Sequence, residues 1–345
     1  MQKLLSIIIP AYNRPTNLDL LLKSLIAAAD EDFLSQIEVI VSDDSTEPLP
    51  IEEVCIQNSA FLDIKYVKNN AEIHGPGTNR KNGLNNATGK WIMSMDDDDC
   101  FHSNFQFIKD YLINAEDDVI MIRTPWFEWE EDGTLWVCNH CDITLNMITH
   151  GKIYRKSFID EHNITYSDFY RYNEDAYFNF QFYPYIYGSK THRELRLNFS
   201  FYQFLNNKES ISRREDEEGD AFDKAVRNNT YSWIDSYFFN TIPILDTFTQ
   251  EERQNYYEFI LPVFCYIVRG MNWIEDNDGF SQEQLDTYNR FFNEWRRLFK
   301  DNRILENHYC VEEFYLEKRL YLTNNNFFNV LDRVHLKKVN INGGE

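Results

Sequence analysis

Short apolar runs alternate with amphipathic stretches along the first part of the chain. Residues Leu4 to Ile9 are almost continuously apolar and are closed by Pro10, which is typical of a buried parallel strand. Apolar residues recur at helical spacing from Leu18 to Ile26, which predicts a helix. The same reasoning predicts further strands at 37–44, 64–67 and 90–95, and a helix at 79–87. Strands that alternate with helices predict an α/β fold with a doubly wound, mostly parallel sheet.

The pattern changes in the second half of the chain. Residues 119–212 mix short strands, aromatic clusters and a helix near 175–182, and a highly charged run follows from Arg213 to Asp220. Helical periodicity dominates beyond this run. We therefore predict two domains, residues 1–215 and a mainly helical 220–345. The aromatic-rich helices of the second domain could form a homo-oligomer, bind an acceptor or pack on the first domain.

Two acidic clusters follow predicted strands, Asp43-Asp44 and the run from Asp96 to Asp99. Ligands of open α/β sheets gather at the carboxyl ends of the strands, so both clusters are site candidates. Four adjacent carboxylates repel one another, and a divalent cation would relieve this cost. Carboxylate oxygens suit Mg²⁺ or Mn²⁺. A solvated acidic loop or a helix cap remains the alternative reading of the cluster alone.

Composition excludes some classes of partner. The chain has 345 residues, and 56 acidic against 34 basic residues give a net charge of −22, which disfavours nucleic acid and anionic membranes. Six scattered cysteines without a preceding secretory signal indicate a reduced, cytoplasmic protein. We find no apolar stretch long enough for a membrane helix. The expected location is cytoplasmic, with peripheral association at the inner membrane face as an option.

A glycine-containing loop from His74 to Gly83 includes Arg80, which could meet a phosphate, although this signal is weak by itself. Several segments follow one another in a fixed order along the chain, namely Pro10-Ala11-Tyr12-Asn13, Asp43-Asp44, Gly77 to Gly83, Met95 to Asp99, Gly151 to Phe158, Asn173 to Phe178 and Ser210 to Arg213. The order and spacing of these segments resemble those of family 2 glycosyltransferases. The resemblance covers roughly residues 1–215 and leaves the helical part unassigned.

The resemblance implies a GT-A, Rossmann-like catalytic domain that binds a nucleotide-sugar, most often a UDP-sugar. On this chain, Pro10 and Tyr12 would border the uracil and Asn13 would lie beside them. Asp44 would accept a hydrogen bond from the base, with Asp43 supporting that loop or the ribose. Arg80 would approach the base or the diphosphate.

The same resemblance implies an inverting reaction that depends on Mn²⁺ or Mg²⁺. Asp96 would lie near the ribose and the metal, Asp97 would belong to the donor site, and Asp98 would bind the cation directly. Asp175 would be the general base of a single displacement, supported by Glu174. The resemblance thus implies a hexosyl- or N-acetylhexosaminyltransferase.

Other residues have weaker assignments. Arg213 could close over the diphosphate from a mobile loop. His150 could contact donor or acceptor, but a lone histidine is more often structural. Three tryptophans, Trp126, Trp129 and Trp136, could meet an acceptor sugar, and core packing is the more common use.

The acceptor and the rival functions stay open at this point. By analogy with similar enzymes, we expect a glycan or lipid-linked precursor of a surface polysaccharide. The family commonly has Ala-Arg-Asn where this chain has Asn79-Arg80-Lys81, which leaves the donor sugar undecided. The alternatives are a sugar-phosphate nucleotidyltransferase, a non-catalytic carbohydrate- or nucleotide-sugar-binding protein, and a transferase acting on modified nucleic acid bases.

Overall fold

The computed structural model describes residues 2–47, 49–130, 132–138, 147–168, 173–205 and 240–271. The chain divides into two compact units, residues 1–182 with 191–217, and residues 183–190 with 218–345. The boundary between residues 215 and 220 remains a sequence prediction.

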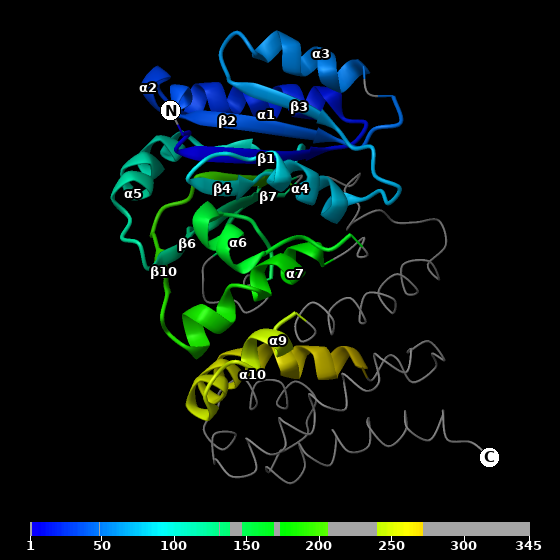
Figure 1. Cartoon of the computed structure of the whole chain (residues 1–345). Coiled ribbons are helices and arrows are strands. Elements are labelled where there is room, and N and C mark those ends of the chain that lie inside the picture. Colours follow the sequence, from blue (N-terminus) through cyan, green and yellow to red (C-terminus); the bar gives the residue numbers. More distant parts are fainter. Residues whose placement is uncertain are drawn as a thin grey trace, which may run out of the picture. The chain divides into compact units, whose positions relative to one another are not determined.

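A seven-stranded sheet forms the centre of the first unit, in the order β10-β6-β9-β4-β1-β2-β3 (Figure 1). Neighbouring strands run parallel except around β9, which is antiparallel to both β4 and β6. The prediction of an α/β fold with a mostly parallel sheet is confirmed. The strands are β1 (Leu5–Ala11), β2 (Ile37–Asp43), β3 (Ile64–Lys68), β4 (Trp91–Ser94), β6 (Val119–Arg123), β9 (Lys152–Arg155) and β10 (Arg193–Arg196).

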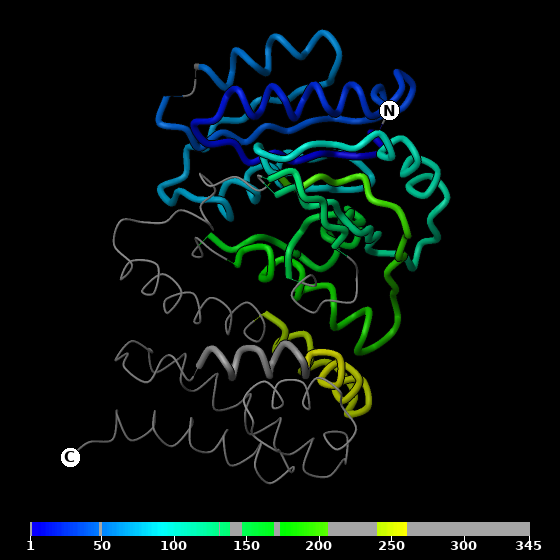
Figure 2. The backbone as a smooth tube through the Cα atoms, turned by 180° about the vertical axis from the view of Figure 1, so that it is seen from behind, coloured from blue at the N-terminus to red at the C-terminus, as the bar shows by residue number. Residues whose placement is uncertain are grey.

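Alternating side chains of β1 hold helices on both faces of this sheet. Ile7 and Ile9 belong to the core that includes Leu18, Leu21 and other apolar residues of α1 (Pro15–Ala28). Ile8 points to the other face, where α4 (Pro76–Asn85) packs so closely that a Cβ on Gly83 would lie 2.4 Å from the Ile8 side chain. Figures 1 and 2 show α1 beside α3 (Leu49–Asn58) from opposite sides. The sheet is therefore covered on both faces, as a parallel sheet requires.

The remaining helices of the first unit are short. They are α2 (Glu31–Ser35), the 3₁₀ helix η1 (Ser103–Phe107), α5 (Ile108–Asn114), α6 (Lys156–His162) and α7 (Glu174–Phe180). The predicted helix at 175–182 corresponds to α7, which begins at Glu174 after Asn173 in a left-handed conformation.

A second, four-stranded sheet lies in the same unit, in the order β5-β11-β7-β8. Strand β11 is parallel to β7 and antiparallel to β5, and β8 is antiparallel to β7. The strands are β5 (Cys100–Phe101), β7 (Trp126–Trp129), β8 (Leu135–Cys138) and β11 (Tyr202–Leu205). This sheet begins one residue after the acidic run and therefore extends the site region.

The second unit is described over η3 (Pro184–Gly188, a π-helix), α9 (Ile242–Leu245) and α10 (Gln250–Met271). Tyr187 stacks on Phe259 with ring centroids 3.7 Å apart, which ties η3 to α10. The predicted helices at 281–299 and 311–336 lie outside the described residues, as does the charged run from Arg213. Within the described ranges, none of the helices has the length and apolar character needed to span a membrane.

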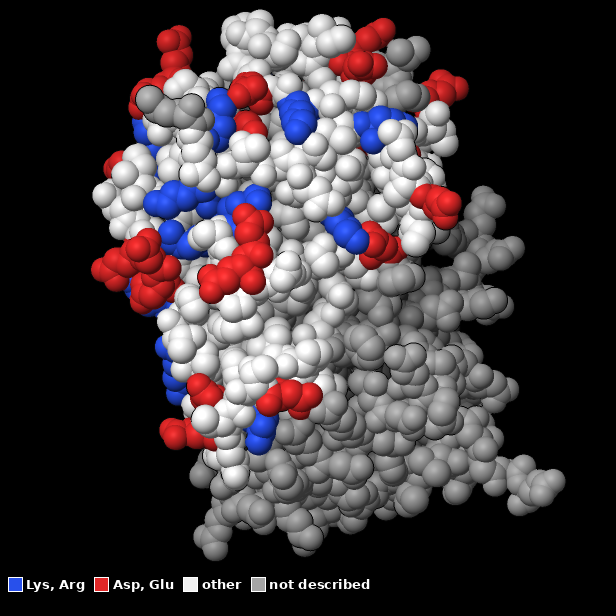
Figure 3. All heavy atoms as spheres, in the orientation of Figure 1, with Lys and Arg blue, Asp and Glu red and all other residues white. Residues whose placement is uncertain are grey.

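Acidic residues outnumber basic residues in the sequence, but the surface is not uniformly acidic. On the face drawn in Figure 3, basic and acidic side chains of the described residues lie interspersed. A continuous basic patch for a polyanion is not seen on this face among those residues.

Candidate functional site

The four aspartates after β4 form a tight turn at the carboxyl end of the sheet. The backbone N–H of Asp99 donates to the carbonyl of Asp96 at 3.2 Å, so the chain reverses within the run. Asp97 and Asp99 are buried, whereas Asp96 and Asp98 are partly exposed. The turn therefore points its four carboxylates in different directions, and each has its own partners.

Arg14 holds the middle of the run. Its guanidinium forms ion pairs with Asp97, at 2.5 Å, and with Asp98. The backbone N–H of Tyr12 also donates to Asp97 at 3.2 Å. Burial nevertheless raises the pKa of Asp97 to about 8, and burial with the nearby charge of Asp96 raises the pKa of Asp98. Burial thus disfavours the charged forms of Asp97 and Asp98 in spite of the ion pairs with Arg14.

Arg80 connects the acidic run to α7. Its guanidinium lies 2.5 Å from Asp96, hydrogen-bonds Glu174 and lies 3.4 Å from Asp175. The side chain is only 4% exposed, so these charge pairs are shielded from water. Burial opposes ionisation of Asp96, but the charges of Arg80 and His150 outweigh it and lower the pKa of Asp96 below its usual range. The charges of Arg80 and His150 therefore favour the ionised form of Asp96.

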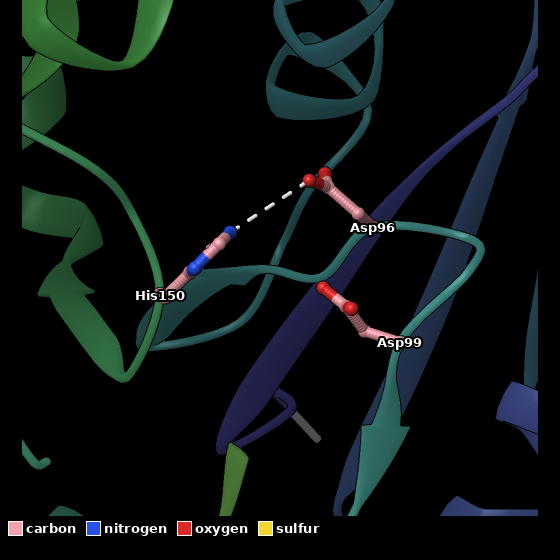
Figure 4. Close-up of side chains that lie close together, drawn as sticks. All are labelled: Asp96, Asp99 and His150. Carbon is pink, nitrogen blue, oxygen red and sulfur yellow. Dashed lines mark ion pairs between the residues drawn. The ribbon is translucent and has the colours of Figure 1, made fainter. Parts of the chain in front are cut away.

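Asp96, Asp99 and His150 form a group with the spacing of metal ligands. One ligand atom from each lies within 4.8 Å of the others, and Figure 4 shows the imidazole and both carboxylates converging. His150 Nε2 lies 3.9 Å from Asp96, and its ring stacks on Tyr202 and Phe204. Burial raises the pKa of Asp99 well above its usual value, against the pull of His150. Carboxylate oxygens with an imidazole nitrogen fit Mn²⁺, and a cation would compensate this buried charge.

Asp175 is oriented by the loop that also carries His150. The backbone N–H and the hydroxyl of Thr149 both donate to Oδ2 of Asp175, each at 3.2 Å. Oδ1 is buried, and among the described residues it accepts no hydrogen bond. Burial, with the neighbouring Asp175, raises the pKa of Glu174 to about 7 against the pull of Arg80. Thr149 thus fixes Oδ2 of Asp175, whereas Oδ1 faces the Arg80 guanidinium at 3.4 Å.

The amide of Asn179 supports this loop. It donates to the carbonyl of Met147, at 2.8 Å, and to that of Asp175, at 2.9 Å. Buried Lys152 donates to Ile148 and to the Asn179 side chain. These bonds fix the loop against α7 one turn beyond Asp175.

The first nucleotide-site candidates lie at the ends of β1 and β2. Tyr12 is 46% exposed, and Asn13, with a φ of 53°, donates its N–H to Ser45 at 2.8 Å. Buried Asp43 accepts hydrogen bonds from Ser45 and Tyr66. Asp44 accepts from Asn69 and the Gly75 N–H and lies 2.6 Å from Nδ1 of His74. Pro10, in β1, is partly exposed.

Comparison with the sequence predictions gives a mixed result. The structure gathers Asp96, Arg80, Glu174 and Asp175 into one charge network, but it pairs Asp98 with Arg14 instead of placing it in the metal-ligand group. The roles of Asp98 and of the nucleotide residues remain predictions, and Arg213 lies outside the described residues. Sequence reasoning did not assign Arg14, Thr149 or Asp99, and it favoured a structural role for His150. Of Arg14, Thr149 and Asp99, only Asp99 had a signal in the sequence, because it belongs to the acidic run.

The glycosyl transferase family 2 profile matches residues 6–172, which contain the strands β1 to β9 and the acidic run. The match covers 167 of the 345 residues, and over them the chain is similar to glycosyl transferase family 2.

Two curated relatives match shorter segments. An uncharacterized glycosyltransferase of Haemophilus influenzae is 34% identical over 98 residues, which are 28% of this chain and 30% of that protein. The GalNAc(5)-diNAcBac-PP-undecaprenol beta-1,3-glucosyltransferase of Campylobacter jejuni is 37% identical over 97 residues, 28% of this chain and 29% of that protein. The matched segments thus span under a third of each relative.

Solved structures support the fold over nearly the whole length. S. aureus TarS 1-349 in complex with UDP-GlcNAc gives a TM-score of 0.52 at 16% identity, over 94% of this chain and 93% of that one. The same protein in complex with UDP gives a TM-score of 0.51 at 17% identity, with the same coverage. At this identity the likeness defines the GT-A fold alone.

Proposed function

We propose that the protein is an inverting glycosyltransferase that moves a sugar from a nucleotide-sugar to a hydroxyl of a carbohydrate acceptor. The observation that carries this proposal is the geometry of Asp175. Thr149 fixes one of its oxygens, the other accepts no hydrogen bond among the described residues, and Arg80 links it to Asp96. A general base needs such an orientation and an oxygen without a hydrogen-bond donor, and Oδ1 has the Arg80 charge facing it, at 3.4 Å.

The proposed reaction is a single displacement. The acceptor oxygen forms a bond with the anomeric carbon, the bond from that carbon to the diphosphate oxygen breaks, and the hydroxyl proton passes to Asp175. The charge of Arg80 keeps Asp175 oriented for this transfer. A divalent cation held by Asp96, Asp99 and His150 would neutralise charge on the diphosphate leaving group.

The comparisons suggest which substrates to test first. TarS was solved with UDP and with UDP-GlcNAc, so UDP is the first nucleotide to test. The Campylobacter jejuni relative is named for an undecaprenol-linked glycan, which suggests a lipid-linked or related glycan acceptor. The hexosyl or N-acetylhexosaminyl class follows from the same reasoning.

Calorimetry and turnover of the Asp175→Asn variant test this proposal together. UDP should bind wild type and variant equally and only when Mn²⁺ is present, because Asp175 lies outside the metal-ligand group. Transfer from the UDP-sugar, or its slow hydrolysis, should fall at least about 100-fold in the variant. Asp117→Asn, at a fully exposed carboxylate, is the matched control and should keep full activity.

Two results would contradict the proposal. Unchanged turnover in Asp175→Asn would remove the base from the mechanism. Failure of UDP, GDP and dTDP alike to bind, with or without Mn²⁺, would reject the nucleotide-sugar site itself.

A further inference from the structure

One face of the four-stranded sheet connects the candidate metal group to an exposed tryptophan. In the strand register, Phe204 of β11 lies opposite Glu128 of β7, and Glu128 lies opposite Trp136 of β8. Residues opposite each other in register share a face, because side chains alternate along a strand. His150 stacks on Phe204 with ring centroids 5.1 Å apart. The side chains of Phe204, Glu128 and Trp136 therefore form a single row across the sheet, and His150 lies at the Phe204 end of this row.

Distances along this row suit a small ligand. Neighbouring strands lie about 4.8 Å apart, so β8 is roughly 10 Å from β11. A sugar bound beside His150 would thus lie next to Glu128 and Trp136. Tyr202 and Trp126, the next pair on this face, also contact the His150 ring, with ring centroids 4.7 Å and 5.9 Å away.

The chemistry of the two residues is that of a sugar subsite. The indole of Trp136 is 58% exposed, an unusual position for the largest aromatic side chain in a short strand. Glu128 is partly buried and accepts a weak hydrogen bond from the thiol of Cys138 at 3.4 Å. An aromatic face accepts the apolar side of a pyranose, and a carboxylate accepts hydrogen bonds from its hydroxyls.

We propose that Trp136 and Glu128 form a carbohydrate subsite that binds the acceptor sugar, with the pyranose stacked on Trp136 and a hydroxyl donating to Glu128. This proposal rests on the proposed function, because the row begins at the group assigned to the donor and its metal. The occupant is a pyranose and not a second protein copy, because the row pairs its aromatic ring with a carboxylate and continues into the candidate active site.

The test uses the full chain labelled with 5-fluorotryptophan and observed by ¹⁹F NMR. The Trp136→Phe and Trp126→Phe variants assign two signals, one in the subsite and one beside His150. Methyl glycosides of glucose, galactose, mannose, N-acetylglucosamine and N-acetylgalactosamine are added in the presence of UDP and Mn²⁺. At least one glycoside should shift the Trp136 signal with a saturable curve.

Two variants test whether the change in the Trp136 signal comes from sugar binding at the subsite or from a general change in the protein. Glu128→Gln should weaken binding of that glycoside roughly tenfold, because a charge-assisted hydrogen bond is lost. Leu135→Ala is the matched control, since Leu135 lies on the same strand, is 42% exposed and points to the opposite face. It should leave the affinity unchanged.

The outcomes separate this proposal from the proposed function. If nucleotide shifts the Trp126 signal but none of the glycosides shifts Trp136, the subsite is rejected and the donor site stands. If Trp136 responds to a glycoside while Trp126 ignores every nucleotide, the donor site is rejected and the subsite stands. A Trp136 signal that depends on protein concentration, without sugar, would identify a self-association surface and reject the subsite.

Discussion

Two acidic clusters end strands on either side of β1, and they are held in opposite ways. After β2, the oxygens of Asp43 and Asp44 are occupied mainly by neutral donors from nearby turns, such as Ser45, Gly75 and Asn69. After β4, Asp96 and Asp98 are held by the guanidinium groups of Arg80 and Arg14. Neutral donors fix a carboxylate in place, whereas cationic partners leave charge that an incoming metal or phosphate can rebalance.

This difference shows that the number of aspartates at a strand end does not define a site. Both clusters lie at the same edge of the sheet, and both contain buried carboxylates. Their partners distinguish a cluster that shapes a loop from one that can bind a cation. Substitutions in and beside the two clusters test this distinction.

The largest effect is expected at Asp96. Asp96→Asn should weaken Mn²⁺-dependent UDP binding by about 100-fold or more, since a ligand carboxylate and the Arg80 ion pair are both lost. Titration calorimetry with and without Mn²⁺ measures this. Asp98→Asn in the same assay examines the sequence prediction for that residue, and an equal loss would place Asp98 among the metal ligands. Unchanged metal dependence in Asp96→Asn would contradict the assigned metal group.

A smaller effect, on stability instead of binding, is expected at Asp43. Asp43→Ala removes the acceptors of the Ser45 N–H and the Tyr66 hydroxyl and should lower the free energy of unfolding by about 2 to 3 kcal/mol. Urea denaturation measures this loss, and the UDP binding that remains should still depend on Mn²⁺. Tyr66→Phe removes only one of these bonds and should cost about 1 kcal/mol. Loss of metal dependence in Asp43→Ala would erase the contrast between the clusters.

The smallest effect concerns pH. The pKa of Glu174 is about 7 in the folded protein and about 4.5 as a free side chain, so the folded state binds the proton more tightly. Its contribution to stability is complete below pH 4.5 and is lost as the pH rises to about 7. Glu174→Gln should remove on the order of 1 to 3 kcal/mol of this pH-dependent change in unfolding free energy. Denaturation curves across this range should therefore be flatter for the variant, and identical slopes would contradict the assignment.

The sequence was most informative where local pattern decides the structure. Strand β1 is almost entirely apolar and β2 has an apolar centre, and both are buried, so the local pattern located them. Strand β9 reads Lys-Ile-Tyr-Arg, yet all four residues are buried. Lys152 is accommodated by Asn179, and Arg155 by backbone carbonyls and the face of Trp91. Such compensation comes from distant segments, so no local pattern could predict it.

The residues of the candidate site also divide into those that a sequence motif predicts and those that only the folded structure identifies. Arg80, Asp96 and Asp175 occur in motifs whose order resembles a known family, and the structure brings them together. Arg14 and His150 have no motif of their own. Arg14 gains its importance from ion pairs to residues about eighty positions away, and His150 from aromatic rings of β11. These relations exist only in the folded chain.

The shared position of Arg80 has a consequence for how the two ends of the site influence each other. One guanidinium contacts Asp96 on one side and Glu174 and Asp175 on the other. Any charge that arrives beside Asp96 changes how strongly Arg80 attracts Asp175, because the same positive charge is divided between them. Arg80 therefore couples the acidic run to the start of α7, and a charge bound at one end changes the electrostatic attraction at the other.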